Sequence, residues 1–417
     1  MQTIKCGLLF FSLVYFHLAF GADTLKVSLQ KADEVFLAKN YYLLAKSMNV
    51  EEQKAQILQA KIYPNPIFTA DFNAYDPQNN RTFHVGQTGQ KSFQFEQLIL
   101  IGGKRKAEID LAKLSAGRAE IEFTQLTREL KFQLHSDLFT NGQQILLLKK
   151  YNEQLSLLSG LLDSYQVQAD KGNIPLAEVV RLKGTYLRLN NDKTELLKDY
   201  YDIQTSLQTL LQTNDVVEFE FTESDIEKYI KTIEFTSITN EAQQNRPELL
   251  LAEQDKLVAE QNLSLQKRQA VPDINLFTSY DQRGGAFVNQ INAGFAIPIP
   301  IWNRNQGAIS AAKYHIESAD YLLKANQEEL FGTLFNAYSY YNHTVEEYNK
   351  VLQLYNGDFE STLKGMTDNF LKRNISIIEF VDFFESYNDV LTELTRVKTR
   401  LIVSGEKLNL LIGKDLY

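Results

Sequence analysis

The chain is built from two copies of one large unit, and each copy holds a single β-hairpin between long helical segments. Six landmarks of the first copy return in the same order about 200 to 208 positions later: Glu52-Gln53 and Glu260-Gln261, Pro64 and Pro272, Ile101 and Ile301, Ile109 and Ile309, Ala112-Lys113 and Ala312-Lys313, and Lys171-Gly172-Asn173-Ile174 and Lys372-Arg373-Asn374-Ile375. This displacement far exceeds the repeat length of solenoid proteins. Because two strands cannot close a sheet, the hairpins are expected to pair with strands of other chains.

The first residues have the pattern of a secretory signal, which we assign to residues 1–21. Lys5 precedes an apolar stretch from Gly7 to Phe20, and small residues favour cleavage before Ala22. A membrane anchor is the competing interpretation, but this stretch is shorter than the ~18 residues of a membrane helix. The protein is therefore expected to leave the cytoplasm.

Composition argues against several classes of function. The chain has 43 basic and 52 acidic residues and a formal net charge of -9, which disfavours nucleic acid as a partner. The single cysteine, Cys6, lies in the signal, so the mature chain has no thiol for a disulfide, a metal or a nucleophile. Past the signal, no apolar stretch approaches the ~18 residues of a membrane helix. A mature chain that crosses a bilayer must do so with strands.

A helical pattern over residues 27–61 leads to the first predicted hairpin, at about residues 67–101. Apolar residues such as Phe68 and Phe72 alternate there with polar ones, which predicts strands with one apolar and one polar face. The polar loop over residues 76–90 shows no core of its own.

The second predicted hairpin covers about residues 273–301, with an apolar residue at every second position from Ile291 to Ile301. Pro298 and Pro300 cannot donate to a strand ladder, so strand pairing is expected to end there or to lie at an edge. Trp302 follows at once. Its ring fits a membrane interface, where amphipathic rings are favoured, and equally an ordinary, partly buried indole.

Uninterrupted helical patterns follow the hairpins, at about residues 104–169 and 305–370, and each turns and runs back to about Leu211 or Leu411. At about 1.5 Å per residue, each long helix would extend on the order of 100 Å, more than the width of a compact domain. The second has a coiled-coil seam between Leu330 and Phe359. The predicted fold is mainly α with a small β part.

The duplication divides the mature chain into three parts. The first structural repeat covers residues 22–213 and the second covers residues 240–417. Between them, residues 214–239 start with an alternating strand pattern and continue with acidic residues. This equatorial connector is expected to form a small mixed cap on the outside of the helices.

Three short motifs accompany the duplicated unit: Pro64-Asn65-Pro66, Asn245-Arg246-Pro247-Glu248-Leu249 and Asn303-Arg304-Asn305-Gln306-Gly307. With these motifs in this order and spacing, the chain resembles the TolC family of outer-membrane efflux channels over nearly its whole mature length. The junction Ile101-Gly102-Gly103-Lys104-Arg105-Lys106 is most similar to the heavy-metal branch of that family, the cobalt-zinc-cadmium efflux channels.

The resemblance implies a homotrimer in the outer membrane of a Gram-negative bacterium. Four strands from each of three chains would close a 12-stranded β-barrel, and the helices would continue it as an α-helical tunnel across the periplasm. Such a channel is the passive exit duct of a tripartite efflux pump, with a periplasmic adaptor protein, an inner-membrane pump and outer-membrane lipid as partners. The residues expected to face lipid are Phe68, Phe72 and Ile291, and those expected to face water are Asn73, Asn292 and Gly294.

The resemblance also implies two sets of site residues. Glu379 and Asp382 lie one helical turn apart and would form an acidic tunnel gate of six carboxylates in a trimer. Alternatively, they form a solvated helix N-terminus, where acids are favoured. The helical turns expected to contact the adaptor contain Gly172, Asn173, Ile174, Pro175, Arg373, Asn374, Ile375 and Ser376. Arg373 stands where the family usually has glycine, which leaves the shape of that turn open.

Glycines mark both strand-to-helix junctions. Gly102, Gly103 and Gly307 would let the backbone adopt the unusual angles that a swing from strand to helix requires. A phosphate-binding loop is the alternative, but the chain lacks the G-x-x-x-x-G-K-[ST] pattern.

No catalytic or cofactor pattern is present, so we expect neither an enzyme nor a resident cofactor. The histidines of the mature chain, His84, His135, His315 and His343, are isolated and do not predict a metal site. Arg118 and His135 remain unassigned as lumen residues, because one sequence does not fix the rotation of a helix.

Two other classes of protein remain open. A periplasmic adaptor also has long helices, but it carries one helical hairpin flanked by split β-domains. A secreted periplasmic coiled-coil scaffold would explain the signal and the heptads, but not two amphipathic hairpins at matched positions. The sequence does not distinguish drugs, bile acids, metal ions and peptides as cargo of a channel.

Overall fold

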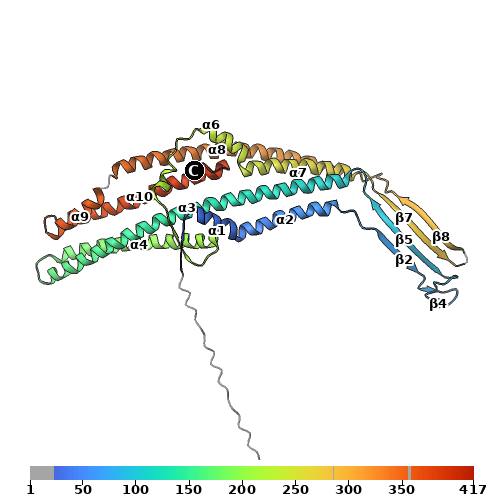
Figure 1. Ribbon diagram of the computed structural model, residues 1–417, viewed down its shortest axis with the longest axis horizontal. Helices are drawn as coiled ribbons and strands as arrows, with labels where there is room; N and C mark the ends of the chain where they lie inside the picture. The colour runs from blue at the N-terminus through green and yellow to red at the C-terminus, as the bar shows by residue number, and fades with distance from the viewer. Residues whose placement is uncertain (1–22, 285, 356–357) are drawn as a thin grey trace, which may run out of the picture.

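The computed structural model describes residues 23–284, 286–355 and 358–417 and shows a long, gently bowed rod (Figure 1). Strands form one end, helical turns form the other, and long helices connect the two. As predicted, the chain is mainly helical with a small β part. The predicted signal, residues 1–21, lies outside the described residues.

The β-hairpin and the helices on either side of it follow in the same order in the two copies of the unit. The first comprises β1 (Thr24–Val27), α1 (Leu29–Lys39), α2 (Tyr41–Lys61), β2 (Ile67–Phe72), β3 (Tyr75–Asp76), β4 (Arg81–Thr82), β5 (Gln90–Ile99), α3 (Lys104–Asp170) and α4 (Leu176–Leu211). The connector and the second copy comprise β6 (Val216–Phe219), α5 (Glu223–Glu227), α6 (Phe235–Asn245), α7 (Pro247–Gln269), β7 (Ile274–Arg283), β8 (Phe287–Ala296), α8 (Gln306–Leu354), α9 (Asp358–Leu371) and α10 (Ile377–Ile412).

Four helices form a wall that the strands continue. The wall is one layer thick, and α2, α3, α7 and α8 pack side by side in that order. The sheet has the corresponding order β2-β5-β7-β8 and is antiparallel throughout. Toward the other end of the rod, α4 packs on α3, and α10 packs on α3, α8 and α9.

The helical pattern predicted over residues 27–61 corresponds to two helices, α1 and α2, which meet at Asn40. The Oδ1 atom of this buried side chain accepts hydrogen bonds from the backbone N–H groups of Tyr42 (3.0 Å) and Leu43 (3.1 Å), which caps α2. Its Nδ2 atom donates to the carbonyl oxygen of Leu210 at 3.0 Å. Asn40 therefore ends one helix, begins the next and ties both to α4.

The second long helix is also interrupted, contrary to the prediction for residues 305–370. Tyr355 leaves the helical region (φ -94°, ψ 77°) and ends α8, and α9 begins at Asp358. The rings of Tyr355 and Phe359 stack across the interruption with centroids 5.1 Å apart. Before it, the seam is packed as predicted, with Leu334 and Tyr341 fully buried.

The loop between β2 and β5 is more ordered than predicted. β3 and β4 pair within it, and the buried side chain of His84 joins two of its segments. His84 Nδ1 lies 2.7 Å from Asp76 Oδ2, and His84 Nε2 lies 3.0 Å from Thr88 Oγ1. The expectation that this loop has no core is therefore wrong, because three polar side chains supply one.

Two buried clusters stabilise the helical part. The larger lies at the middle of the rod, where α1, α3, α4, α8 and α10 meet β1, β6 and α6, and it includes Phe36, Leu138, Phe139, Tyr229, Tyr341 and Leu401. The smaller lies near the helical turns, where the rings of Phe370 and Phe380 stack with centroids 4.4 Å apart. Large aromatic side chains contribute most of the buried area in such clusters.

Within the part of the chain that the structure describes, no helix combines the length and the apolar character needed to cross a membrane. The same residues contain no group of His, Cys, Asp and Glu side chains arranged to hold a metal ion.

Candidate functional site

The four-stranded sheet has two faces of opposite character. Directly paired residues of an antiparallel sheet point to the same side, so the observed register assigns each side chain to a face. Most of the large apolar side chains lie on one face: Phe68, Phe72, Phe93, Phe95, Leu276, Tyr280, Ile291 and Phe295. The opposite face is mainly polar and carries Asp71, Ser92, Gln94, Glu96, Asn275, Ser279, Asp281 and Asn292, together with Ile67, Leu98 and Phe277.

Aromatic contacts organise the apolar face. Phe93 is at its centre, with ring centroids 6.2 Å from Phe68, 5.7 Å from Phe72 and 6.1 Å from Tyr280. Much of this face is nevertheless uncovered, and Ile291 is 76% exposed. Contiguous exposed apolar surface of this kind marks an interaction with lipid or with another protein.

Carboxylates and amides organise the polar face. The Nε2 atom of Gln94 donates to Glu96 Oε2 at 3.1 Å, and Asn275 Nδ2 donates to Glu96 Oε1. The register places Asn292 and Gly294 on this face, opposite Phe68, Phe72 and Ile291. Asn73 follows the end of β2, and its backbone N–H donates to Gln90 O at 3.1 Å.

The first strand-to-helix junction uses both predicted glycines. Gly102 and Gly103 have φ angles of 70° and 75°, a region that L side chains rarely adopt. Asp273 fixes the junction, because its Oδ1 atom accepts from the Ile101 backbone N–H at 3.1 Å and its Oδ2 atom lies 2.7 Å from Lys104 Nζ. Asp273 lies beyond Pro272 in the other copy, and the sequence did not predict its role at this junction.

The second junction corrects the prediction for Gly307. The left-handed residue is Asn305, with φ 60°, and Gly307 lies in the first turn of α8 without a positive φ. The Nδ2 atom of Asn305 donates to the carbonyl oxygen of Gln266 at 2.8 Å. Asparagine tolerates the left-handed region, so it replaces glycine here.

The two helical turns at the other end have the same shape. Arg373 (φ 62°) adopts the conformation of Gly172 (φ 73°), which settles the shape of the second turn. In each turn the following asparagine donates a backbone hydrogen bond of 2.9 Å, from Asn173 to Gln168 O and from Asn374 to Asn369 O. Both turns therefore close in the manner of a helix C-terminus that ends in a left-handed residue.

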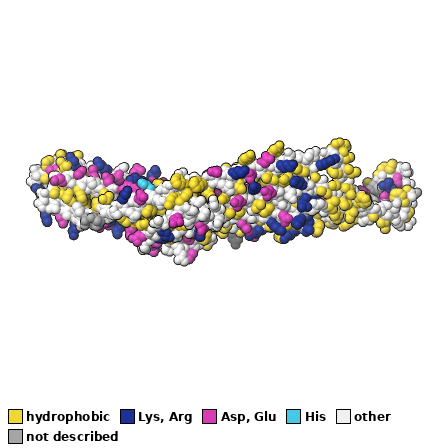
Figure 2. Space-filling model, turned by 90° about the horizontal axis from the view of Figure 1, so that it is seen from above, with side chains coloured by type: hydrophobic (Ala, Val, Ile, Leu, Met, Phe, Trp, Pro, Cys, Tyr) yellow, Lys and Arg dark blue, Asp and Glu magenta, His cyan; other side chains and the backbone are white. Residues whose placement is uncertain are grey.

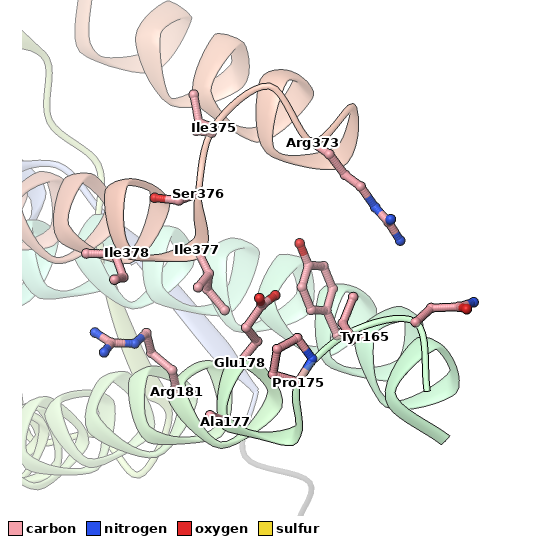
Figure 3. Close-up of a pocket in the computed structure, with 12 residues that line it drawn as sticks. Tyr165, Pro175, Ala177, Glu178, Arg181, Arg373, Ile375, Ser376, Ile377 and Ile378 are labelled. Atoms are coloured by element: carbon pink, nitrogen blue, oxygen red, sulfur yellow. The ribbon is translucent and has the colours of Figure 1, made fainter. Parts of the chain in front are cut away.

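A cavity of about 530 Å³ lies between the two turns (Figure 3). Six of the predicted contact residues line it: Asn173, Ile174, Pro175, Arg373, Ile375 and Ser376. Tyr165, Glu178 and Arg181 complete much of the wall. Burial raises the pKa of Tyr165, and the nearby carboxylate of Glu178 raises it further. The cavity thus combines an apolar floor with charges of both signs.

The predicted gate residues lie at the start of α10. Ser376 and Glu379 form a capping box, in which the Ser376 backbone N–H donates to Glu379 Oε2 at 2.7 Å and the Glu379 backbone N–H donates to Ser376 Oγ at 3.2 Å. The hydrogen bonds from Ser376 lower the pKa of Glu379, so this carboxyl is ionised at neutral pH. Asp382 is exposed one turn further on. Glu379 therefore caps the N-terminus of α10.

The middle of the rod contains a buried ionic cluster that the sequence did not predict. His135 is 5% exposed, its Nε2 atom lies 2.8 Å from Asp33 Oδ1, and its Nδ1 atom lies 3.2 Å from Glu406 Oε2. Tyr229 donates its hydroxyl hydrogen bond to Glu406 Oε1. Burial opposes a charge here, but the interactions with the carboxylates of Asp33 and Glu406 outweigh it and raise the pKa of His135 to about 9. The cluster thus joins α1, α3, α10 and the connector.

Arg118, whose role the sequence did not predict, links helices of the wall. Its Nε atom lies 2.5 Å from Asp255 Oδ1 on α7, and its guanidinium also pairs with Glu122. Lys46 on α2 pairs with Glu122 at 2.6 Å. This ladder of charges runs across α2, α3 and α7.

A duplicated unit whose one-layer helical wall continues into an open four-stranded sheet defines the fold of outer-membrane efflux channels. The chain superposes on the solved structure of CusC with a TM-score of 0.74 and 16% identity, covering 93% of this chain and 92% of that one. The outer membrane protein VceC of Vibrio cholerae gives a TM-score of 0.72 and 14% identity, covering 93% and 97% of the two chains.

Sequence comparison agrees with the fold. Residues 238–358 match the family described as outer membrane efflux protein. The cobalt-zinc-cadmium resistance protein CzcC of Cupriavidus metallidurans is 23% identical over 326 residues, which cover 75% of this chain and 72% of that protein. A segment of the chain thus matches this family, and the predicted resemblance to outer-membrane efflux channels is confirmed.

Proposed function

We propose that three copies of this chain form the outer-membrane exit duct of a tripartite efflux pump. The observation that carries the proposal is the open sheet with one apolar and one polar face. Its outer strands β2 and β8 each have one partner among the described residues, so both edges are free. Closure with two further copies removes every free edge and gives lipid and water each a suitable face.

Exposed aromatic side chains on the outer helices of the wall support the trimer. On α2, Tyr41 and Tyr42 are uncovered, and on α8, Tyr314, Tyr321 and Phe331 are uncovered. Helix α2 continues strand β2 and helix α8 continues strand β8. One neighbouring copy would therefore cover α2 and β2, and the other would cover α8 and β8. The helical tunnel would then cross the periplasm and the barrel would cross the outer membrane.

The helical turns suit a periplasmic adaptor protein. The cavity between them is lined by residues of both copies of the unit, so a single inserted side chain or loop would contact both turns. We propose this surface, with Gly172 and Asn374 at its margin, as the adaptor contact. Cargo would pass through this channel passively, and an inner-membrane pump would supply the energy.

The cargo is a small molecule or a metal ion. The printed name of the relative CzcC, a cobalt-zinc-cadmium resistance protein, supports metal ions among the candidates. No catalytic role is proposed for any residue.

The trimer is tested by fractionating membranes of cells that express the full chain and comparing unheated and heated outer-membrane extracts on a gel. We expect a species of three times the monomer mass that heating converts to the monomer. A monomer in the soluble periplasmic fraction would contradict the proposal and favour a secreted coiled-coil scaffold or adaptor.

The gate is tested with a double variant, Glu379→Gln/Asp382→Asn, in planar bilayers under a KCl gradient. Six carboxylates near one opening favour cations, so we expect the variant to lose several-fold of its K⁺ over Cl⁻ preference. Glutamine preserves the capping box, so the helix should be retained. Glu178→Gln, at the equivalent position of the first copy, is the matched control and should keep the preference. If the unaltered chain, the double variant and Glu178→Gln all showed the same K⁺ over Cl⁻ preference, Glu379 and Asp382 would not form a gate. They would then serve only as a helix cap and a solvated side chain.

A further inference from the structure

Cationic side chains gather where the helical wall meets the strands. The four segments at this boundary, residues 59–66, 100–107, 265–273 and 297–307, contain seven cations and one carboxylate in a chain whose net charge is -9. We call these cations the cationic belt; its members are Lys61, Lys104, Arg105, Lys106, Lys267, Arg268 and Arg304. Figure 2 shows Lys and Arg side chains concentrated on this part of the helices, beside a band of hydrophobic side chains.

Most cations of the belt have no ion partner among the residues that the structure describes. The one carboxylate, Asp273, pairs with Lys104 at 2.7 Å. The other six cations form no salt bridge among the described residues. Uncompensated like charges repel each other, so this arrangement indicates a negatively charged partner outside the chain.

Neutral groups hold the guanidinium groups in place. The Nε atom of Arg105 donates to the carbonyl oxygen of Lys61 at 3.1 Å, and its Cζ atom lies 4.0 Å from the centre of the Tyr63 ring. Arg268 donates to the carbonyl oxygen of Gly102 at 3.0 Å, and Arg304 to that of Pro300 at 3.2 Å. Carbonyls and rings orient these cations without cancelling their charge, and each guanidinium keeps further donors for an anion.

An apolar groove lies within the belt. Its volume is about 360 Å³, and it runs between the end of α7 and the segment after β8, lined by Pro272, Pro298, Ile299, Pro300, Ile301 and Trp302. The belt residues Lys267-Arg268 immediately precede one wall of the groove, and Arg304 follows the other. Trp302, 86% exposed, presents an amphipathic ring at its rim.

We propose that the cationic belt binds the phosphate groups of anionic phospholipids in the membrane leaflet next to the helices, with an acyl chain against the Trp302 groove. The inference rests on the proposed function, in which the strands cross the membrane and this boundary lies at its surface. A phospholipid fits both features, because it places an anion beside an apolar chain, whereas a soluble anion uses only the charge. The belt would fix the height of the channel in the membrane.

Trp302 provides the probe, because it is the only tryptophan of the chain. The full-length channel in detergent would be titrated with phosphatidylglycerol whose acyl chains are brominated, which quenches nearby tryptophan fluorescence, and in parallel with brominated phosphatidylcholine. We expect brominated phosphatidylglycerol to quench Trp302 fluorescence at a much lower concentration than brominated phosphatidylcholine does. In the variant Lys106→Gln/Lys267→Gln/Arg304→Gln, the half-quenching concentration should rise at least about tenfold, because each cation near a membrane surface adds to anionic lipid binding.

The matched control removes three cations far from the strands, in the variant Lys149→Gln/Lys198→Gln/Lys364→Gln. Its half-quenching concentration should equal that of the unaltered chain. In the belt variant, Lys106 and Lys267 are exposed and donate no side-chain hydrogen bond within the described residues, whereas Arg304 donates one to Pro300 O. Circular dichroism and the heated gel check that the variant folds and assembles. The proposal would be overturned if the two lipids quenched the fluorescence equally. It would also be overturned if the half-quenching concentration shifted equally in the belt variant and the control variant. Relief of quenching by millimolar inorganic phosphate would instead indicate a site for free phosphate.

Membrane fractionation separates failure of the belt from failure of the channel. If the unaltered chain is absent from the outer membrane, the proposed function fails. If it is present but does not distinguish the two lipids, only the inference about the belt fails.

Discussion

Replacing Glu406 with glutamine is expected to destabilise the folded chain by about 3–5 kcal/mol, the usual cost of breaking a buried ion pair. The substitution keeps the shape of the side chain but removes the charge that faces His135 at 3.2 Å. His135 would remain buried with Asp33 alone. The measurement is the midpoint of unfolding in urea, followed by circular dichroism in detergent at fixed protein concentration.

The control for Glu406→Gln is Glu34→Gln, which removes an exposed carboxylate paired with Lys31 at 3.1 Å. An exposed pair contributes about 0–1 kcal/mol, so this variant should unfold close to the unaltered chain. Equal midpoints for the two variants would show that the buried cluster does not stabilise the fold.

The same cluster predicts a pH dependence of defined sign. Folding raises the pKa of His135 from its ordinary value of 6.5 to about 9, so the charged form is favoured in the folded state. The stabilisation is fully present below pH 6.5 and is lost as the pH rises through 9. As the pH is raised from 7 to 10, the urea midpoint of unfolding should therefore decrease more steeply for the unaltered chain than for Glu406→Gln.

The features that the sequence predicted well are those with a local period. Strand side chains alternate between faces, so Phe68 and Phe72 could be assigned to one face and Asn292 to the other without knowledge of the register. The seam of α8 was predictable for the same reason, because its three- and four-residue steps match the helical repeat. Duplication helped further, since each copy supplied an independent check of the order of elements.

The features that the sequence did not predict depend on residues far apart in the chain. Asn40 interrupts a continuous helical pattern because it bonds to Leu210, 170 positions away. His135 is isolated among its sequence neighbours, and its partners Asp33 and Glu406 come from helices at opposite ends of the chain. At the second junction, the positive φ moved from the expected Gly307 to Asn305, since asparagine tolerates that conformation.

Replacing Phe93 with arginine is expected to prevent the chain from entering the outer membrane. Phe93 lies at the centre of the apolar face, where its ring contacts Phe68, Phe72 and Tyr280. If this face meets lipid, an arginine near the middle of the bilayer costs about 2–4 kcal/mol in addition to the lost ring contacts. The measurement is the fraction of chain recovered as heat-sensitive trimer in the outer membrane.

The neighbouring residue on the same strand provides the control. Gln94 is one position along β5 and faces the opposite side of the sheet. Gln94→Arg adds the same charge to the face proposed to line water, so it should insert and assemble as the unaltered chain does. It would also place a cation near Glu96, to which Gln94 now donates a hydrogen bond. If both variants fail equally to form the trimer in the outer membrane, the strands do not tolerate arginine on either face. If only Gln94→Arg fails, the assignment of the two faces to lipid and water is reversed. Only a selective loss of Phe93→Arg fits a barrel with its aromatic face in lipid, because both variants gain the same charge on the same strand.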